Sequence, residues 1–331
     1  MRSRSRSGSM PHARHSANTR TEALLDAGLP PEVIQLVHGT GSTVGNPLVA
    51  HPKVPVISFT GSTESGARLG EVCGRMHKRL SLEMGGKNAM IVMADADLDL
   101  ALEGVLWGAF GTTGQRCTAT SRLLLHRKVH DKFLRMLCDR VEKLRLGDGL
   151  LPDTEVGPMI NEGALQNTMR YVEVGKQQGA SLEVGGRRAT GARLANGWFY
   201  RPTVFAGVKP KSRLEQEEIF GPVLSVTRIG SLDEAIRVNN DVKYGLSSAL
   251  YTRDVNGAFR AVQEIDAGIT YINAPTIGAE AHLPFGGVKE TGNGHREGGW
   301  AVYEFFSETK VVYVDYSGRL QRAQIDTYGD E

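Results

Sequence analysis

At residues 54–66 the chain reads Val54-Pro55-Val56-Ile57-Ser58-Phe59-Thr60-Gly61-Ser62-Thr63-Glu64-Ser65-Gly66, an apolar run followed by a glycine turn and the start of a helix. Strand-like runs continue to alternate with helical segments along the chain, and this alternation predicts an α/β fold with parallel sheets. The strands are expected at residues 33–38, 54–59, 121–126, 223–229, 247–252 and 269–273. The helices are expected at residues 22–27, 97–110, 130–144, 162–178, 232–239 and 255–265, with another ending at residue 78. Asp95 or Asp97 is expected to cap the helix at 97–110.

The turn that follows the first of these strands suits a phosphate group. Backbone amides at a helix N-terminus, together with the hydroxyls of Ser62 and Thr63, favour a pyrophosphate. The glycine spacing is that of a P-loop, but Ala67-Arg68 replaces the required Lys-Ser/Thr, which argues against a nucleotide triphosphatase. The turn also departs from the GxGxxG pattern, so a strand–helix connection without a ligand remains an alternative.

Composition limits the partners and the compartment. The chain has 331 residues, enough for two domains, and its net charge of +2 gives no reason to expect nucleic acid or an anionic membrane as a partner. It contains no apolar run of about eighteen residues that would predict a transmembrane helix. Its three cysteines are widely spaced, which predicts a reducing, cytoplasmic location and argues against disulfides and a metal site. Residues 1–20, rich in Arg and Ser, are expected to be a disordered tail or a non-native leader.

A reactive thiol is indicated by Gly114-Gln115-Arg116-Cys117-Thr118. A cysteine in a basic glycine loop is a nucleophile when a neighbour such as Arg116 lowers its pKa. Glu83, in a separate glycine-rich segment, suits a general base that activates water. The pair predicts covalent catalysis through a thioester. The alternatives are an inert buried thiol and an ordinary turn carboxylate, and Cys73 and Cys138 are expected to be inert core thiols.

Five motifs in this order resemble the aldehyde dehydrogenase superfamily over residues 21–316. They are Ile57-Ser58-Phe59-Thr60-Gly61-Ser62-Thr63, Leu82-Glu83-Met84-Gly85-Gly86-Lys87-Asn88, Gly114-Gln115-Arg116-Cys117-Thr118-Ala119, Glu217-Glu218-Ile219-Phe220-Gly221-Pro222-Val223 and Pro284-Phe285-Gly286-Gly287-Val288-Lys289. The resemblance implies oxidation of an aldehyde to a carboxylic acid with NAD or NADP. It makes Cys117 the nucleophile, whose backbone N–H is an oxyanion donor, and Glu83 the base that hydrolyses the thioester.

The resemblance also implies a cofactor site. Glu218 matches the carboxylate that holds the nicotinamide ribose, and Phe220 the aromatic residue that packs near the ring. Gly61 and Ser62 match the pyrophosphate contact. The choice between NAD and NADP stays open.

The implied fold has an incomplete Rossmann-like cofactor domain, an α/β catalytic domain and an oligomerisation strand. We expect the leader at 1–20, the cofactor-domain remnant at 21–85 and the catalytic domain at 86–285. A return to the cofactor domain is expected at 286–306, the oligomerisation strand at 307–318 and a tail at 319–331. Family members carry a long segment before the position of residue 21, so we expect a truncated member whose cofactor domain and oxyanion hole are only partly present.

The substrate is expected to be a small aldehyde, specifically a semialdehyde that carries a carboxylate. Arg116 is placed to bind that carboxylate, or alternatively only tunes the thiol or pairs with a neighbouring acid. The loop at 273–280, which contains Gly278 and Ala279, resembles that of the antiquitin-like branch. The resemblance implies that the β-rich run at 310–316 pairs with a partner subunit, so we expect a homodimer or homotetramer, with an ordinary edge strand as the alternative.

Two alternatives to an active, hydrolytic dehydrogenase stay open. The chain is either an active dehydrogenase or a non-catalytic remnant that associates with full-length subunits. Transfer of the acyl group to coenzyme A is a third possibility, which the presence of Glu83 argues against because that reaction needs no activated water.

Overall fold

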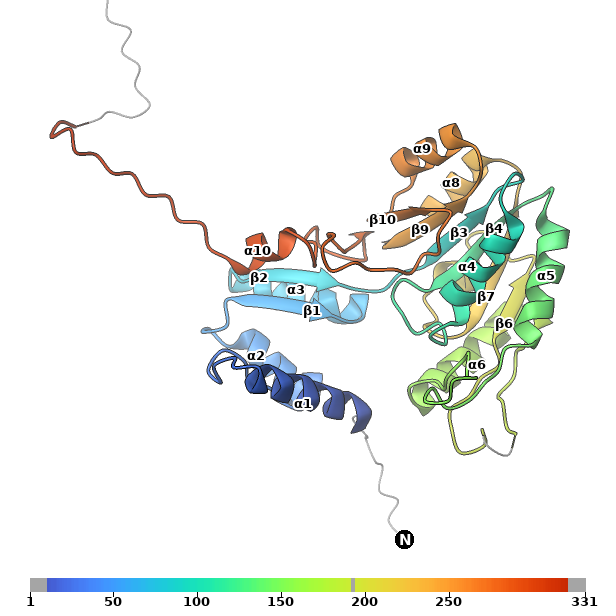
Figure 1. Ribbon diagram of the computed structural model, residues 1–331, viewed down its shortest axis with the longest axis horizontal. Helices are drawn as coiled ribbons and strands as arrows, with labels where there is room; N and C mark the ends of the chain where they lie inside the picture. Colours follow the sequence, from blue (N-terminus) through green and yellow to red (C-terminus); the bar gives the residue numbers. More distant parts are fainter. Residues whose placement is uncertain (1–10, 192–193, 321–331) are drawn as a thin grey trace, which may run out of the picture.

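A seven-stranded sheet organises the larger part of the molecule (Figure 1). The structure is a computed structural model that describes residues 11–191 and 194–320. The strand order is β10-β9-β3-β4-β7-β6-β5, and every neighbouring pair is parallel except β5 with β6. The strands are β3 Asn88–Val92, β4 Thr120–His126, β5 Ser181–Val184, β6 Thr203–Ala206, β7 Val223–Ile229, β9 Ser247–Tyr251 and β10 Ile269–Ile272.

Helices cover both faces of this sheet. The helices are α4 Leu98–Phe110, α5 His130–Glu142, α6 Glu162–Gln177, α7 Arg213–Gln216, α8 Leu232–Asn240 and α9 Val255–Glu264. Met90 and Val92 of β3 pack with α4 and α5, whereas the alternate residues Ala89 and Ile91 pack with α8 and α9. Burial on both faces explains why β3 is apolar from Ala89 to Val92.

A smaller parallel pair, β1 Val56–Thr60 and β2 Arg79–Glu83, is joined by helix α3 Thr63–Arg75 (Figure 1). Cys73 and Leu82 belong to the core between them. The remaining elements are α1 Pro11–Asp26, η1 Gly41–Gly45, α2 Asn46–Ala50, β8 Tyr244–Gly245, β11 Val288–Lys289 and α10 Ala301–Phe306. Thr60 pairs in register with Glu83, so both strands present their carboxyl ends at the same edge.

The predicted α/β fold is confirmed, and most predicted helices and strands lie within two or three residues of their expected bounds. Asp97, not Asp95, caps α4, because its side chain accepts a hydrogen bond from the Leu100 N–H. Asp95 instead accepts hydrogen bonds from the Thr252 hydroxyl and the Arg253 N–H. The sequence prediction missed β2 and β3, which flank the glycine pair at Gly85 and Gly86.

Two local predictions are wrong. Residues 33–38 form no strand, because strand propensity needs a neighbouring strand to pair with. Residues 11–20 belong to helix α1, so the disorder expected there is not found, while residues 1–10 lie outside the described part of the chain. Within the described ranges, no helix is long and apolar enough to cross a membrane.

Candidate active site

The predicted site residues meet at a cleft of about 730 Å³ beside the carboxyl ends of β1 and β2. The cleft is lined by Thr60, Gly61, Ser62, Met84, Gly85, Gln115, Arg116, Cys117, Thr118, Asn167, Glu218, Ile219, Phe220, Gly278, Ala279 and Phe285. All the predicted site residues are in this lining except Glu83, which lies buried behind it. Residues far apart in the sequence therefore form one site.

Cys117 occupies a tight turn between α4 and β4. The turn is closed by a 3.1 Å hydrogen bond from the Ala119 N–H to the Arg116 carbonyl. Gly114 precedes it with φ of 65°, and a Cβ there would lie 2.2 Å from the Gly221 carbonyl oxygen. Only glycine fits this close approach in a left-handed conformation.

The predicted lowering of the Cys117 pKa by Arg116 is not found. Burial raises the pKa of the thiol, and the nearby charges of Glu218 and Glu83 add to this, while the backbone N–H groups of Thr118 and Cys117 oppose it. The Arg116 guanidinium lies over the ring of Trp107, 5.9 Å from its centroid. It forms no ion pair with any carboxylate in residues 11–191 or 194–320.

Glu83, at the end of β2, is only 4% exposed. Neither of its carboxylate oxygens has a hydrogen-bond partner among the described residues. Burial, first, and the charge of Glu297 raise its pKa to about 8, while Arg296 acts in the opposite sense. A Cβ at Gly286 would lie 2.4 Å from Glu83 Oε1, so the carboxylate packs against bare backbone. Such an acid is suited to take up a proton near neutral pH.

The loop that carries Glu218 is fixed by hydrogen bonds from two segments, the β2–β3 connection and helix α6. Glu218 Oε1 accepts from the Gly86 N–H at 3.0 Å. The buried Lys87 Nζ donates to the Glu217 carbonyl at 2.6 Å, and Asn167 Nδ2 donates to the Ile219 carbonyl at 3.0 Å. These contacts leave Glu218 Oε2 as an acceptor at the edge of the cleft.

The glycine turn of β1 lies next to the base. The Gly61 N–H donates to the Glu83 carbonyl at 3.0 Å. Ser62 caps α3, and its hydroxyl oxygen accepts from the Ser65 N–H at 3.2 Å. A helix N-terminus that opens onto the cleft through Gly61 and Ser62 suits a pyrophosphate.

Sequence reasoning missed the residues that hold these loops in place. Gln115 donates to the Pro158 carbonyl and accepts from the Ile160 N–H, and Thr276 donates to the Thr118 carbonyl at 2.7 Å. Polar residues beside a nucleophile are the only sequence signal for such contacts, because the partners lie tens of residues away.

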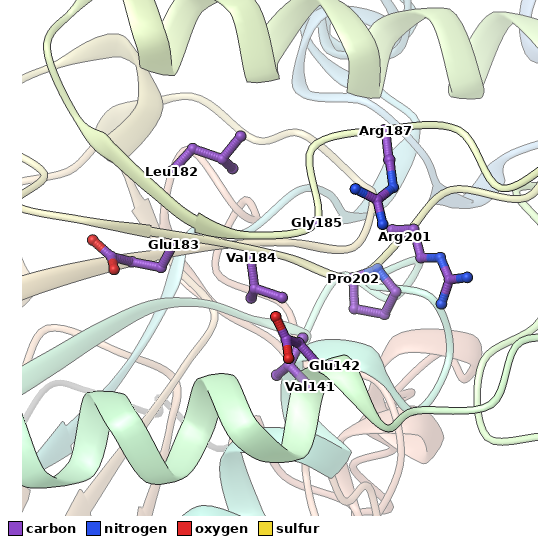
Figure 2. Close-up of a pocket in the computed structure, with 9 residues that line it drawn as sticks. All are labelled: Val141, Glu142, Leu182, Glu183, Val184, Gly185, Arg187, Arg201 and Pro202. Carbon is purple, nitrogen blue, oxygen red and sulfur yellow. The ribbon is translucent and has the colours of Figure 1, made fainter.

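A second cavity, of about 490 Å³, lies at the β5 edge of the large sheet (Figure 2). Figure 2 shows Arg187 and Arg201 close together on one side of this cavity and Glu142 and Glu183 elsewhere along its wall. None of the predicted site residues lines it. The second cavity therefore lies apart from the predicted site residues.

Comparison with known protein families gives a match over most of the chain. The model named Aldehyde dehydrogenase family matches residues 11–312. Alpha-ketoglutaric semialdehyde dehydrogenase of Bacillus subtilis is 42% identical over 289 residues, covering 87% of this chain and 59% of that protein. The 2,5-dioxopentanoate dehydrogenase of Saccharolobus solfataricus is 44% identical over 295 residues, covering 88% of this chain and 61% of that protein.

A solved structure agrees with this. Betaine aldehyde dehydrogenase of Staphylococcus aureus in complex with NAD+ superposes with a TM-score of 0.85 at 36% identity, covering 88% of this chain and 57% of that one. This chain thus spans about three fifths of the length of the proteins it matches.

Proposed function

Because the chain belongs to the aldehyde dehydrogenase family, we propose that it oxidises an aldehyde to a carboxylic acid with NAD or NADP, through a thioester on Cys117. The observation that carries the proposal is the cleft itself. It joins the Cys117 turn, the Glu218 loop and the Gly61 turn, with the high-pKa Glu83 directly behind.

Cys117 and Glu83 divide the chemistry. After the Cys117 thiol has lost its proton to solvent, the thiolate adds to the aldehyde carbon, and the resulting oxyanion accepts a hydrogen bond from the Cys117 N–H. After oxidation to the thioester, Glu83 takes a proton from water as that water attacks the acyl carbon, and the thiolate leaves. The raised pKa of Glu83, about 8, supports this role because the carboxylate can both accept and release a proton near neutral pH.

The residues present fit a dinucleotide. The Gly61–Ser62 turn at the start of α3 would hold the pyrophosphate, and Glu218 Oε2 would accept from the nicotinamide ribose, near Phe220. Gly85 supports this fit, since a Cβ there would lie 2.2 Å from Glu218 Oε2 and displace it. When bound, the nicotinamide supplies the acceptor for the hydride.

For the substrate we propose a semialdehyde that bears a carboxylate. Arg116 lines the cleft beside the nucleophile, has no carboxylate partner in the described ranges and is not a cause of the Cys117 pKa shift. An unpaired guanidinium at this position suits the distant carboxylate of a substrate, which would pass Gly278 and Ala279 at the rim. Two relatives are named for dehydrogenases of alpha-ketoglutaric semialdehyde and 2,5-dioxopentanoate.

Arg116→Ala tests this substrate class. Loss of one charge-assisted contact should raise KM for the carboxylate-bearing aldehyde about tenfold or more, and leave KM for a neutral aldehyde of equal length nearly unchanged. Steady-state kinetics with both aldehydes provide the measurement. An equal change for the two substrates contradicts the role.

The dehydrogenase activity is tested by NADH or NADPH formation from a semialdehyde by this chain, with Cys117→Ser as the matched control. We expect turnover in the unsubstituted chain and none in the variant. If the chain hydrolyses an activated ester through Cys117 but forms no reduced cofactor, the nucleophile is active and the cofactor site is not. That outcome contradicts the proposed oxidation. Absence of both activities overturns the proposal.

The compartment and the assembly belong to the same proposal. We propose a cytoplasmic location, because Cys73, Cys117 and Cys138 are all free thiols, as a reducing compartment keeps them. We also propose a homodimer or homotetramer. Its support is the segment 310–316, in which Val311 and Tyr313 are exposed and lack any paired strand within the described chain.

A further inference from the structure

Asn88, the first residue of β3, is 2% exposed and makes contact with the nucleophile turn. Its Nδ2 donates to the Cys117 carbonyl at 2.7 Å and to the Ala119 carbonyl at 2.9 Å. Its Oδ1 accepts from the Ser247 N–H at 3.1 Å. Both amide hydrogens are therefore committed to one turn, while the oxygen is anchored to strand β9.

This contact lies at an irregularity of the sheet. The β3–β4 register shifts between Asn88 and Ala89, and such shifts re-aim side chains near functional sites. The turn also approaches bare backbone here, since a Cβ at Gly86 would lie 2.5 Å from the Cys117 carbonyl oxygen. Space and hydrogen bonding together fix where that carbonyl points.

Fixing the carbonyl also fixes the thiol. The Cys117 and Thr118 peptides belong to the turn that Asn88 holds, and their N–H groups face the sulfur, where they act against the burial that raises the thiol pKa. The Cys117 N–H is also the oxyanion donor of the proposed mechanism. A turn that is free to rotate would lose both functions.

We infer that Asn88 is a positioning residue, which aligns the Cys117 sulfur and N–H by holding the carbonyls of Cys117 and Ala119. This inference rests on the proposed function for its effect on turnover. The effect of Asn88 on the thiol does not depend on a substrate or a cofactor. The inference about Asn88 and the proposed function can therefore fail separately.

The test compares Asn88→Ala with Thr227→Val. Thr227 is a matched control: it is 5% exposed, donates one hydrogen bond to the Val208 carbonyl at 3.0 Å and lies in β7, outside the cleft lining. The rate of Cys117 alkylation by iodoacetamide is measured against pH, with peptide mapping to separate it from Cys73 and Cys138. We expect the profile of Asn88→Ala to move to higher pH, and that of Thr227→Val to stay in place.

Turnover supplies the second measurement. Misalignment should lower kcat of Asn88→Ala by about 10- to 100-fold while KM changes little, since the lost contacts act in the transition state. If Asn88→Ala does not fold, Asn88→Ser is used, because its hydroxyl keeps one donor and an intermediate shift is expected.

An unchanged alkylation profile and kcat in a folded Asn88 variant would overturn the inference, even if its melting temperature fell. If the unsubstituted chain forms no NADH, the proposed function fails, and the alkylation profile alone still decides the role of Asn88.

Discussion

Glu83 is an acid in surroundings that favour its neutral form. The buried carboxyl has a pKa of about 8, against an ordinary value of 4.5, so it ionises as the pH rises through about 8. Hydrolysis of the thioester needs the ionised form, so its rate should rise over the same range. The folded protein binds this proton more tightly than the unfolded chain does, and its stability should therefore fall as the pH rises from 4.5 to about 8.

Glu83→Gln should remove the pH dependence of thioester hydrolysis and the fall in stability between pH 4.5 and about 8. We expect one burst of NADH per active site followed by a steady rate lower by about 10²- to 10⁴-fold, as the acyl enzyme accumulates. Rapid-mixing fluorescence measures the burst, and urea unfolding at pH 5 and pH 8 measures the stability. A variant that turns over at the normal rate with a normal pH profile would remove Glu83 from the mechanism.

At this scale the sequence allowed a prediction of the reacting groups but not of the residues that support them. Cys117 and Glu83 stand in glycine-rich motifs whose residue types suit the chemistry. Lys87 and Asn88 stand in the same motif as Glu83, but their residue types predict no role, because a buried polar side chain is understood only from its partners. The wrong expectation for the effect of Arg116 on the thiol pKa has the same cause, since adjacency in sequence does not place a guanidinium against a sulfur, and this guanidinium lies over the Trp107 ring.

At the scale of elements, a buried ion pair ties the large sheet to helix α7. Arg122 of β4 and Glu215 of α7 are 2% and 1% exposed, with Nη1 and Oε1 2.7 Å apart. The same guanidinium donates to the carbonyls of Lys87, Val238 and Asn239, and so satisfies the last turn of α8. One side chain thus joins three elements.

Removing one partner should be costly. Glu215→Ala leaves the Arg122 charge buried and unpaired, so we expect a loss of about 3 to 5 kcal/mol in the free energy of unfolding. Glu103→Ala is the control, because the Arg140–Glu103 pair has a similar separation of 2.6 Å but is exposed, and should cost less than about 1 kcal/mol. Urea unfolding measures both variants. Equal losses of unfolding free energy in the two variants would show that burial of an ion pair does not decide how much it stabilises the protein.

Helices and strands could be predicted from the sequence where the local residue pattern and the tertiary contacts favour the same secondary structure. The strand at β7 and the helices α4 and α6 follow from periodicity and caps. Residues 33–38 have strand propensity without a partner strand, whereas β2 and β3 were hidden by the glycine pair between them. The order of strands in the sheet, and the ion pair of Arg122, depend on contacts between distant segments that one sequence does not reveal.

At the scale of the whole molecule, residues 310–316 remain apart from all three sheets of the described chain (Figure 1). Val311 is 70% exposed and Tyr313 93%, an unusual surface for an extended apolar segment with unpaired backbone groups. A strand of this kind is completed by pairing with a sheet edge of a second copy. We therefore expect multi-angle light scattering to give a dimer or a larger assembly.

Proline substitutions test whether this segment makes the contact. Val312→Pro with Val314→Pro removes two backbone donors on one side of the strand, and should weaken self-association by about 30- to 100-fold. Val312→Thr with Val314→Thr is the control, because it keeps the donors and the β-branched shape. Sedimentation equilibrium gives the dissociation constants. Association that is unaffected by the prolines would place the interface elsewhere, and a monomeric unsubstituted chain would contradict the assembly itself.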